Sequence, residues 1–515
     1  MVNFQLLRVM GYKSATIALC GLITCFSCLG QNSYLGNTIS FGDVLRVGLE
    51  NNYNIRLSKS SAEQIRGSLQ NAHGHLNPYL DLTNIDNNGT DPTITYGTYR
   101  QANASFVVPT SYGVYFSAGF GAERLAMLIP KQIVNISGYW GGITLPILRG
   151  LGKYNTTNAS IFALKDYYQS KKYSLSDDVV KYVRDVAAAY VQYQTALSIY
   201  NVRQKDVEES GRYERFIQEL IQHNQIAAVE LDRAQSFIYG YKEKLIDAKN
   251  NLYNAYYLLN KIEGNEKRDL AGVNDNLPIC TDSITDPNLI SIKSMNNDIL
   301  TQADSLIEKS TYMKSLEYNQ MGAEMEMKGA KNALMNQLDL GVRYYHYGAE
   351  LNQPESEFSN TFNSPYPGQS VYITLAYHLP IKNEINRGEY LNRTANYEYQ
   401  KEMMEKTKYE ANNGIISLIS NLNNLIQLYK SNRELAGYQQ KTYENEFKKY
   451  KLGAASQLDI ISAYQDFAET RAQSYQLAYN IYSNVVQLKY LIGTLPTEKT
   501  ELERSDLLDI ISISR

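Results

Sequence analysis

The sequence predicts a mixed fold that is mainly α-helical with some β-strand and that contains two structural repeats. Three observations support this fold class. Short motifs recur in the same order in both halves, and four segments alternate apolar and polar residues over about ten positions. Helical segments of roughly 68 residues, or about 100 Å, follow the strands, which is too long for a compact domain.

The composition indicates a folded protein without a strong charge bias. Its 515 residues include 50 Lys and Arg against 53 Asp and Glu, for a net charge of −3. This balance argues against a nucleic-acid-binding protein, because neutralising phosphates needs a basic surplus. Tyr is abundant, with 44 residues against 13 Phe and 1 Trp. Tyr suits surfaces that contact both an apolar medium and water.

Residues 1–30 have the pattern of a secretory signal peptide. Arg8 and Lys13 form a positive start, an apolar run follows, and small residues precede Gln31. The apolar run is shorter than the roughly 20 residues that a membrane-spanning helix needs. Two mature N-termini remain open, since either the chain is cleaved before Gln31 or Cys28 becomes a lipidated N-terminus.

Motifs at nearly constant spacing define the two repeats. The turn at Asn224 matches the turn at Gly453 at a shift of 229 residues, and Gly264 matches Gly493 at the same shift. Near the strands the shift falls from 258 to 234, so repeat one is 24 residues longer there. We therefore assign 31–264 to repeat one, 265–290 to a linker, 291–493 to repeat two and 494–515 to a tail.

Repeat one begins with a helix that opens in a capping box at Ser40–Asp43 and continues to about Leu76. A strand pair follows at about 95–146, and 84–99 is expected to be a loop because it is rich in Asn, Gly and Tyr. A long helical hairpin then has its tip near residue 224. Its return arm has a 4-3 apolar seam from Ala234 to Leu259, the coiled-coil period.

Repeat two has the same order of elements. Its first helix covers about Asp298–Met335, its strand pair about 337–380, and its helical hairpin has a tip near 453. The first strand places Leu338, Leu340, Val342 and Tyr344 on one face. The seam of this hairpin contains polar residues such as Ser474, so we expect it to be weaker and partly wet.

Four strands of this length pose a problem of closure. About ten residues suffice for a tilted strand to cross a bilayer, where an open sheet edge would leave backbone groups unpaired. Single-chain barrels need at least eight strands, so the predicted barrel must close between copies. Two copies would give eight strands with a filled interior, whereas three would give twelve and leave a bore.

The chain resembles the TolC-type outer-membrane efflux protein family over nearly everything after residue 30. The resemblance rests on the strand-to-helix step at Leu145–Gly152 and its counterpart at Leu379–Ile381, on the turn at Gly453–Ala463, and on Tyr490–Gly493. It implies a homotrimer, with four strands from each protomer in a twelve-stranded barrel and a coiled-coil helical barrel below. It also implies an outer-membrane location with a periplasmic extension, contact with outer-membrane lipid, and docking to a periplasmic adaptor and an inner-membrane transporter.

The helical tips are the predicted functional sites. Threefold symmetry would place rings of acidic side chains at a narrow end, where they would select for cations. The pore and gate candidates are Glu230, Asp459 and Ser462. The candidates for the tip turns and for adaptor contact are Asn224, Ala227, Ala228, Gly453, Ala454, Ala455 and Ser456.

Each candidate also has a structural interpretation. Ser456 and Asp459 form a capping box, and Glu230 in a first turn suits the helix dipole. The small residues fit either an adaptor hairpin or ordinary tight helix packing. Family members with a salt-bridge latch carry an Arg where this chain has Ala455 and an acid where it has Ser462, so that latch is not expected here.

No cofactor or metal is expected. His73 and His75 lie two positions apart on a helix and so do not share a face. No nucleophile, phosphate-loop or dinucleotide motif occurs in a fitting context, so we expect no enzyme. The expected function is a passive trimeric exit duct of a tripartite efflux or type I secretion system. The alternative is a secreted coiled-coil scaffold or adhesin without a pore.

Overall fold

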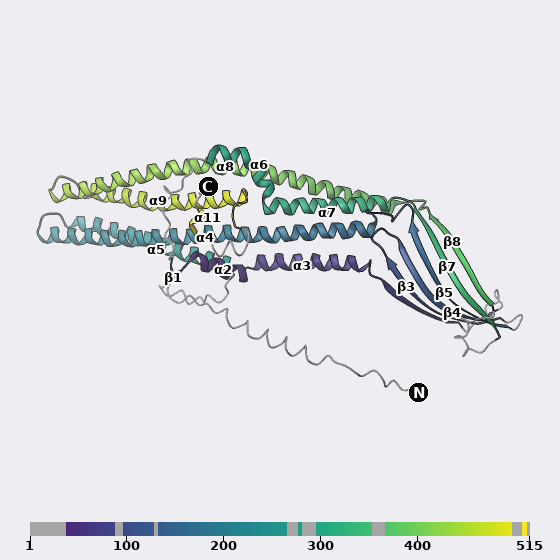
Figure 1. Cartoon of the computed structure of the whole chain (residues 1–515). Helices are drawn as coiled ribbons and strands as arrows, with labels where there is room; N and C mark the ends of the chain where they lie inside the picture. Colours follow the sequence, from purple (N-terminus) through teal and green to yellow (C-terminus); the bar gives the residue numbers. More distant parts are fainter. Residues whose placement is uncertain are drawn as a thin grey trace, which may run out of the picture.

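The computed structural model describes residues 38–87, 96–127, 132–264, 277–280, 295–352, 366–496 and 507–511. These residues form a long helical body that continues at one end into a β-sheet (Figure 1). The predicted mixed, mainly helical fold class is confirmed. The predicted signal peptide, with Cys28, and most of the predicted linker lie outside the described residues.

Each repeat begins with two helices where the sequence predicted one. In repeat one, α2 (Phe41–Asn51) and α3 (Tyr53–Gly74) meet at Asn52, whose side chain accepts hydrogen bonds from the first backbone N–H groups of α3. In repeat two, α6 (Met295–Lys309) and α7 (Thr311–Ala333) meet at Ser310, which caps α7 in the same way. The single-helix prediction was therefore wrong, because Asn and Ser can start a new helix in mid-segment.

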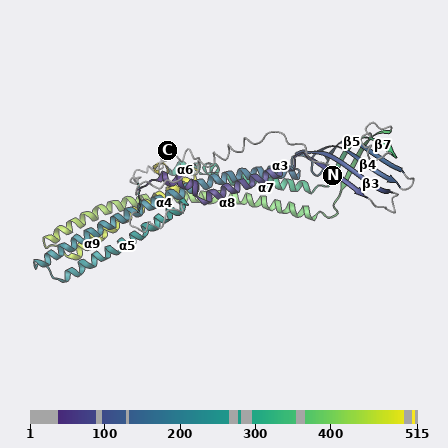
Figure 2. The same ribbon diagram turned by 90° about the horizontal axis from the view of Figure 1, so that it is seen from below.

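The long helices lie where the sequence predicts them. They are α4 (Thr156–Gln222), α5 (Val229–Glu263), α8 (Glu384–Lys451) and α9 (Gln457–Leu491). With 67 and 68 residues, α4 and α8 are each about 100 Å long. The α4–α5 and α8–α9 hairpins run side by side to one end of the body in both views (Figures 1 and 2).

The two coiled-coil seams differ in polarity. Along α5 the seam residues are buried from Ala234 to Leu259, with only Leu245 partly exposed. Along α9 the polar seam residue Ser474 donates a hydrogen bond of 2.6 Å to Asn432 Oδ1 on α8. The second seam is thus held partly by polar side chains, as its sequence predicts.

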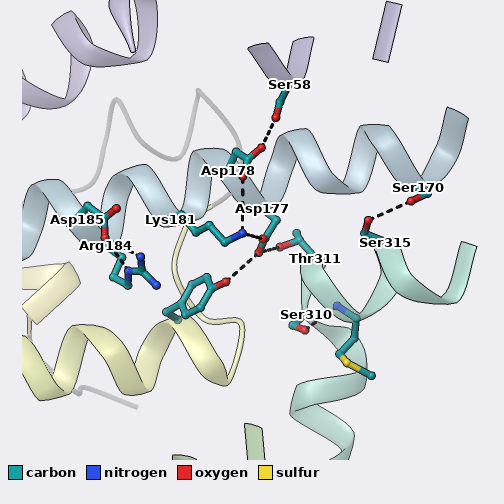
Figure 3. A network of polar contacts seen from close by, with 12 residues as sticks. Ser58, Ser170, Asp177, Asp178, Lys181, Arg184, Asp185, Ser310, Thr311 and Ser315 are labelled. Carbon is teal, nitrogen blue, oxygen red and sulfur yellow. Dashed lines mark hydrogen bonds and ion pairs between the residues drawn. The ribbon is translucent and has the colours of Figure 1, made fainter. Parts of the chain in front are cut away.

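The middle of the body joins both repeats. An apolar core formed by α2, α4, α5 and α9 includes Phe41, Tyr190 and Tyr482, each at most 2% exposed. Beside it, α3, α4 and α7 meet through polar contacts (Figure 3). Asp177 is buried, pairs with Lys181 at 2.8 Å, and accepts a hydrogen bond of 3.1 Å from Thr311. These contacts lie close to the two helix breaks, the one between α2 and α3 and the one between α6 and α7, and stabilise that part of the body.

Two short elements complete this region. The two-residue strands β1 (Thr38–Ile39) and β6 (Ile279–Cys280) pair in parallel, so the linker returns to the start of repeat one. The helix α11 (Leu507–Ile511) packs against α9 and α4. Among the described residues, no helix combines the length and apolar character required to cross a membrane.

The sheet has six antiparallel strands in the order β2-β3-β4-β5-β7-β8. Repeat one contributes four and repeat two contributes two, and β5 pairs with β7 to join the repeats. The strands are β2 (Tyr79–Asn87), β3 (Tyr96–Pro109), β4 (Tyr115–Met127), β5 (Gln132–Pro146), β7 (Gln337–Leu351) and β8 (Tyr366–His378).

The prediction of four strands from each protomer was therefore wrong for repeat one. The segments predicted as strands became β4, β5, β7 and β8, and the alternation of β7 is confirmed by its register. The additional strands β2 and β3 occupy much of the segment expected to be a loop. The 24 extra residues in repeat one have the size of one such hairpin.

Candidate functional site

The six-stranded sheet has one apolar face. Following the register from strand to strand places Leu82, Ala104, Phe120, Tyr139 and His346 in one row, with Leu80 and Phe106 in a neighbouring row. Large apolar side chains on this face are open to the surroundings, including Leu82 at 72% exposure and Ile373 at 71%. We call it the apolar face. Such exposure in water would be costly, so this face suits lipid.

The opposite face, which we call the polar face, is lined by small and polar residues. One row across the sheet is Tyr79, Val107, Ser117, Gly142, Arg343 and Tyr372. Here the Arg343 guanidinium lies 4.3 Å from the ring centre of Trp140, the single Trp of the chain. This alternation of an apolar and a polar face is the pattern of a membrane β-barrel wall.

The first helical tip lies between α4 and α5. Asn224 adopts a left-handed backbone with φ of 53°, which Asn tolerates better than most residues. Ala227 and Ala228 are exposed, and Ala228 provides no side-chain cap for α5. The half-buried Glu230 pairs with Arg233 at 3.2 Å. Its carboxylate therefore already has a cationic partner on its own helix.

The second tip lies between α8 and α9. Gly453 has φ of 73°, and Gly453, Ala454 and Ser456 are exposed while Ala455 is half-buried. Ser456 and Asp459 form the capping box that the sequence predicts. Hydrogen bonds from the side chain and backbone of Ser456 lower the pKa of Asp459. Asp459 thus stays ionised at neutral pH.

The two tips contact each other. Gln457 is buried, and its side-chain amide donates a hydrogen bond of 3.0 Å to the backbone carbonyl of Glu230. Behind this contact, an aromatic cluster of Tyr213, Phe237, Tyr241 and Tyr464 joins α4, α5 and α9. The structure thus brings Glu230 near the Asp459 turn. Ser462 lies exposed one turn further along α9.

A buried ionic cluster lies deeper in the same hairpins. Asp206 on α4 is fully buried and accepts hydrogen bonds from Tyr464 at 3.0 Å, from Arg203 at 3.2 Å and from Arg471. Arg203 also donates to Glu469 at 2.9 Å, and Lys244 on α5 pairs with Glu469. The cluster ties α9 of repeat two to both helices of the first hairpin.

The charges in this cluster support one another. Burial opposes ionisation of Glu469, but hydrogen bonds from Lys244 and Arg203 outweigh it and lower the pKa of Glu469. Burial and the charge of Asp206 raise the pKa of Tyr464, so its hydroxyl stays a donor. Glu469 therefore remains ionised near neutral pH and paired with Arg203 and Lys244.

The sequence alone did not predict this cluster. Arg203 and Asp206 are a common helix pair, and nothing local marks their partners, which lie more than 250 residues away on α9. The available signal is that charged residues occupy inward positions on otherwise apolar helix faces. Within the described residues, no group of three or more His, Cys, Asp or Glu side chains is placed to hold a metal ion.

Comparisons with known proteins relate this geometry to a family. A family model described as outer membrane efflux protein matches residues 303–494, most of repeat two. No curated protein matches the chain. Among solved structures, CusC is 13% identical with a TM-score of 0.65, covering 88% of this chain and 92% of its own.

Two further channels have the same fold. The Campylobacter jejuni CmeC outer membrane channel is 14% identical with a TM-score of 0.63, covering 90% of this chain and 89% of its own. The open-state Neisseria gonorrhoeae MtrE outer membrane channel is 12% identical with a TM-score of 0.61, covering 89% and 90%. At these identities the likeness shows a shared fold.

The predicted resemblance to the TolC-type outer-membrane efflux protein family is thereby confirmed. The family match and the shared fold support an outer-membrane efflux channel. The solved structures with this fold are described as outer membrane channels, in line with the predicted outer-membrane location.

Proposed function

We propose that this protein is a passive exit duct in which three copies share one membrane barrel and one helical tube. The observation that carries the proposal is a sheet with an exposed apolar face whose outermost strands, among the described residues, are β2 and β8, attached to helices of about 100 Å. An open sheet is not viable in hydrocarbon, so the edges must meet those of other copies. Three copies are the number that the resemblance to the TolC-type family implies.

The helical end is the proposed constriction. Three copies would bring three Asp459 and three Glu230 carboxylates around one axis, where a ring of negative charge favours cations. Asp459 is exposed and ionised while it caps its own helix, so capping and pore lining are compatible. Glu230 should contribute less to cation selectivity than Asp459, because Arg233 offsets its charge.

The proposed partners follow from the two ends of the duct. Lipid of the outer membrane surrounds the apolar face, and a periplasmic adaptor docks on the small residues at the tips. Ala227, Ala228 and Ala454 are exposed, which leaves room for a partner helix. An inner-membrane transporter supplies the energy for efflux or type I secretion, as the family resemblance implies.

Planar-bilayer recording with the purified protein tests this function. The detergent-solubilised protein should be a trimer that conducts ions, and Asp459→Asn with Glu230→Gln should reduce its preference for cations. Glu243→Gln removes a negative charge from an exposed position higher on α5 and serves as the control. A detergent-free soluble monomer would refute the duct and favour a scaffold, whereas unchanged selectivity would leave both acids as helix caps.

A further inference from the structure

We propose that the β2–β3 hairpin is part of the membrane wall and that β2 of one copy pairs with β8 of the next. Three copies then close a barrel of eighteen strands, not the twelve that the family resemblance implies. This inference rests on the proposed trimeric duct. It concerns a feature of this chain, the two additional strands of repeat one.

The hairpin continues both faces of the sheet. Leu80 and Leu82 on β2 pair in register with Phe106 and Ala104 on β3, which extend the apolar face from β4. Asp81 and Ser105 lie between them and extend the polar face. A hairpin folded over the barrel mouth or in the periplasm would have no need for two leucines at 61% and 72% exposure.

The apolar face of the hairpin ends in a row of charged residues, as expected at the border of a membrane-spanning segment. Toward the end of the sheet away from the helices, Arg100 on β3 pairs with Asp86 on β2 at 3.3 Å. The same row places Arg124 of β4 beside Arg100. Charged groups are tolerated near the bilayer surface and costly at its centre, so this row marks one border of the apolar band.

The hairpin is tightly joined to the rest of the sheet. On the polar face the side chain of Asn103 on β3 occupies the space over Gly121 on β4, where a Cβ would lie 2.1 Å from its Oδ1 atom. Nearby, a Cβ on Gly119 would meet the backbone of Ala104 at 2.5 Å and the Trp140 ring at 2.9 Å. The glycines of β4 are thus matched to a neighbouring β3.

The stagger of the six strands fits a closed barrel. The row that starts at Tyr79 on β2 crosses the sheet to Tyr372 on β8, six residues before His378 at the helix end of that strand. One residue of offset per strand corresponds to a tilt of roughly 35°, within the range of transmembrane barrels.

The same stagger predicts the contact between copies. A neighbouring copy at the same height in the membrane places its Tyr79 opposite His378, with the two strands antiparallel. Leu82 then lies opposite Leu375 on the apolar face, and Thr83 lies opposite Thr374 on the polar face. Each pair thus joins two residues of the same polarity on the same face. With these contacts every strand edge in the wall is paired.

The wider wall changes what the membrane section can pass. With this tilt and strand spacing, eighteen strands give a barrel about 34 Å across, against about 22 Å for twelve. The polar face combines glycines with larger side chains such as Trp140 and Arg343, which occupy part of this width. The membrane section is therefore a wide exit for bulky cargo, and selection falls to the helical end.

Cysteine cross-linking in the full-length protein tests the contact, in a Cys280→Ala background. Thr83→Cys with Thr374→Cys joins β2 to β8 of the next copy under our proposal. Ser117→Cys with Ala376→Cys is the matched control, because the same stagger would bring these two together only if β4 were the edge strand. A short bifunctional maleimide is added to the protein in outer-membrane vesicles, and each single-cysteine variant controls for non-specific products.

We expect a covalent trimer from the Thr83 and Thr374 pair and monomer from the Ser117 and Ala376 pair. The reverse result would place the hairpin outside the wall and overturn the eighteen strands, while the trimeric duct would stand. A ladder that stops at dimer would overturn both proposals, since two copies close twelve strands. Absence of any cross-link between copies would refute the pairing of the edges.

Discussion

At the scale of single residues, the buried carboxylate of Asp206 carries a large electrostatic cost in the helical body. Asp206 has no exposed surface and lies among Arg203, Arg471 and Tyr464. A buried charge is tolerated only when its partners are fixed around it. Because those partners come from both hairpins, the cluster fixes how the two hairpins lie against each other.

We expect Asp206→Asn to be strongly destabilising. The substitution keeps the shape of the side chain but removes the counter-charge of Arg471 and one of the two carboxylate partners of Arg203, a loss of about 3–5 kcal/mol. Glu209→Gln removes the partner of Arg212 on the surface of the same helix and should cost no more than about 1 kcal/mol. Thermal unfolding in detergent measures both. Similar melting temperatures for the two variants would contradict the structural role of the cluster.

The contribution of the cluster to the stability of the folded protein should decrease in acid. The pKa of Glu469 is lower in the folded protein than its ordinary value of 4.5. Its contribution to stability is therefore fully present above that value and is lost as the pH falls through the lowered pKa. At pH 7 the wild-type protein should have a higher melting temperature than the Glu469→Gln variant. The difference between the two melting temperatures should disappear toward pH 3. A difference that persists in acid would contradict this assignment.

At the scale of elements, the two faces of the sheet meet different environments. The apolar face suits lipid, and the polar face suits water. Trp140 on β5 belongs to the polar face and stacks with Arg343, whereas Phe120 on β4 belongs to the apolar face. The strand alternation alone assigns these two aromatic residues to opposite environments. Since the chain has a single Trp, fluorescence can distinguish them.

We expect brominated lipids to leave the fluorescence of Trp140 largely unquenched. The matched variant, Trp140→Phe with Phe120→Trp, moves the indole to the apolar face and should be quenched several-fold more strongly, because bromine acts over short distances in the acyl region. Fluorescence of the protein in proteoliposomes provides the measurement. Equal quenching of the two proteins would mean that the faces are assigned wrongly.

The sequence predicts some elements better than others. The alternation of Leu338 to Tyr344 correctly indicates β7, since large apolar residues mark one face. In β3 the apolar face is formed largely by Ala102 and Ala104, whose small side chains give little contrast with Asn103 and Ser105. The helix breaks at Asn52 and Ser310 were missed for a similar reason, because both residues also occur within helices.

At the scale of the whole molecule, the length of repeat one sets the width of the proposed barrel. The chain enters β2 and β4 from the same end of the sheet, because Tyr79 and Ser117 lie in one row two strands apart. That separation is about 10 Å, which residues 109–114 can span. The β2–β3 hairpin can thus be removed without rerouting the chain.

Deletion of residues 80–108 should therefore leave a trimer with a narrower membrane pore. Loss of six strands in eighteen reduces the cross-section of the barrel about twofold. Exclusion of polyethylene glycols of graded size, added on the outer-membrane side of a planar bilayer, measures the bore. An unchanged size limit would show that the hairpin does not line the pore.

The sequence by itself determined the repeats, the long helices, four of the six strands and the resemblance to a family of efflux proteins. These features depend on local patterns, which persist in any tertiary setting. Only the tertiary structure decided that β2 and β3 join the sheet and that Asp206 meets Arg471. The ion pair joins residues 265 positions apart, and the period of a segment carries no information about which distant segment lies beside it. The strands β2 and β3 pair with their neighbours along the chain, but the small residues Ala102 and Ala104 conceal the alternation of β3 until its partners are known.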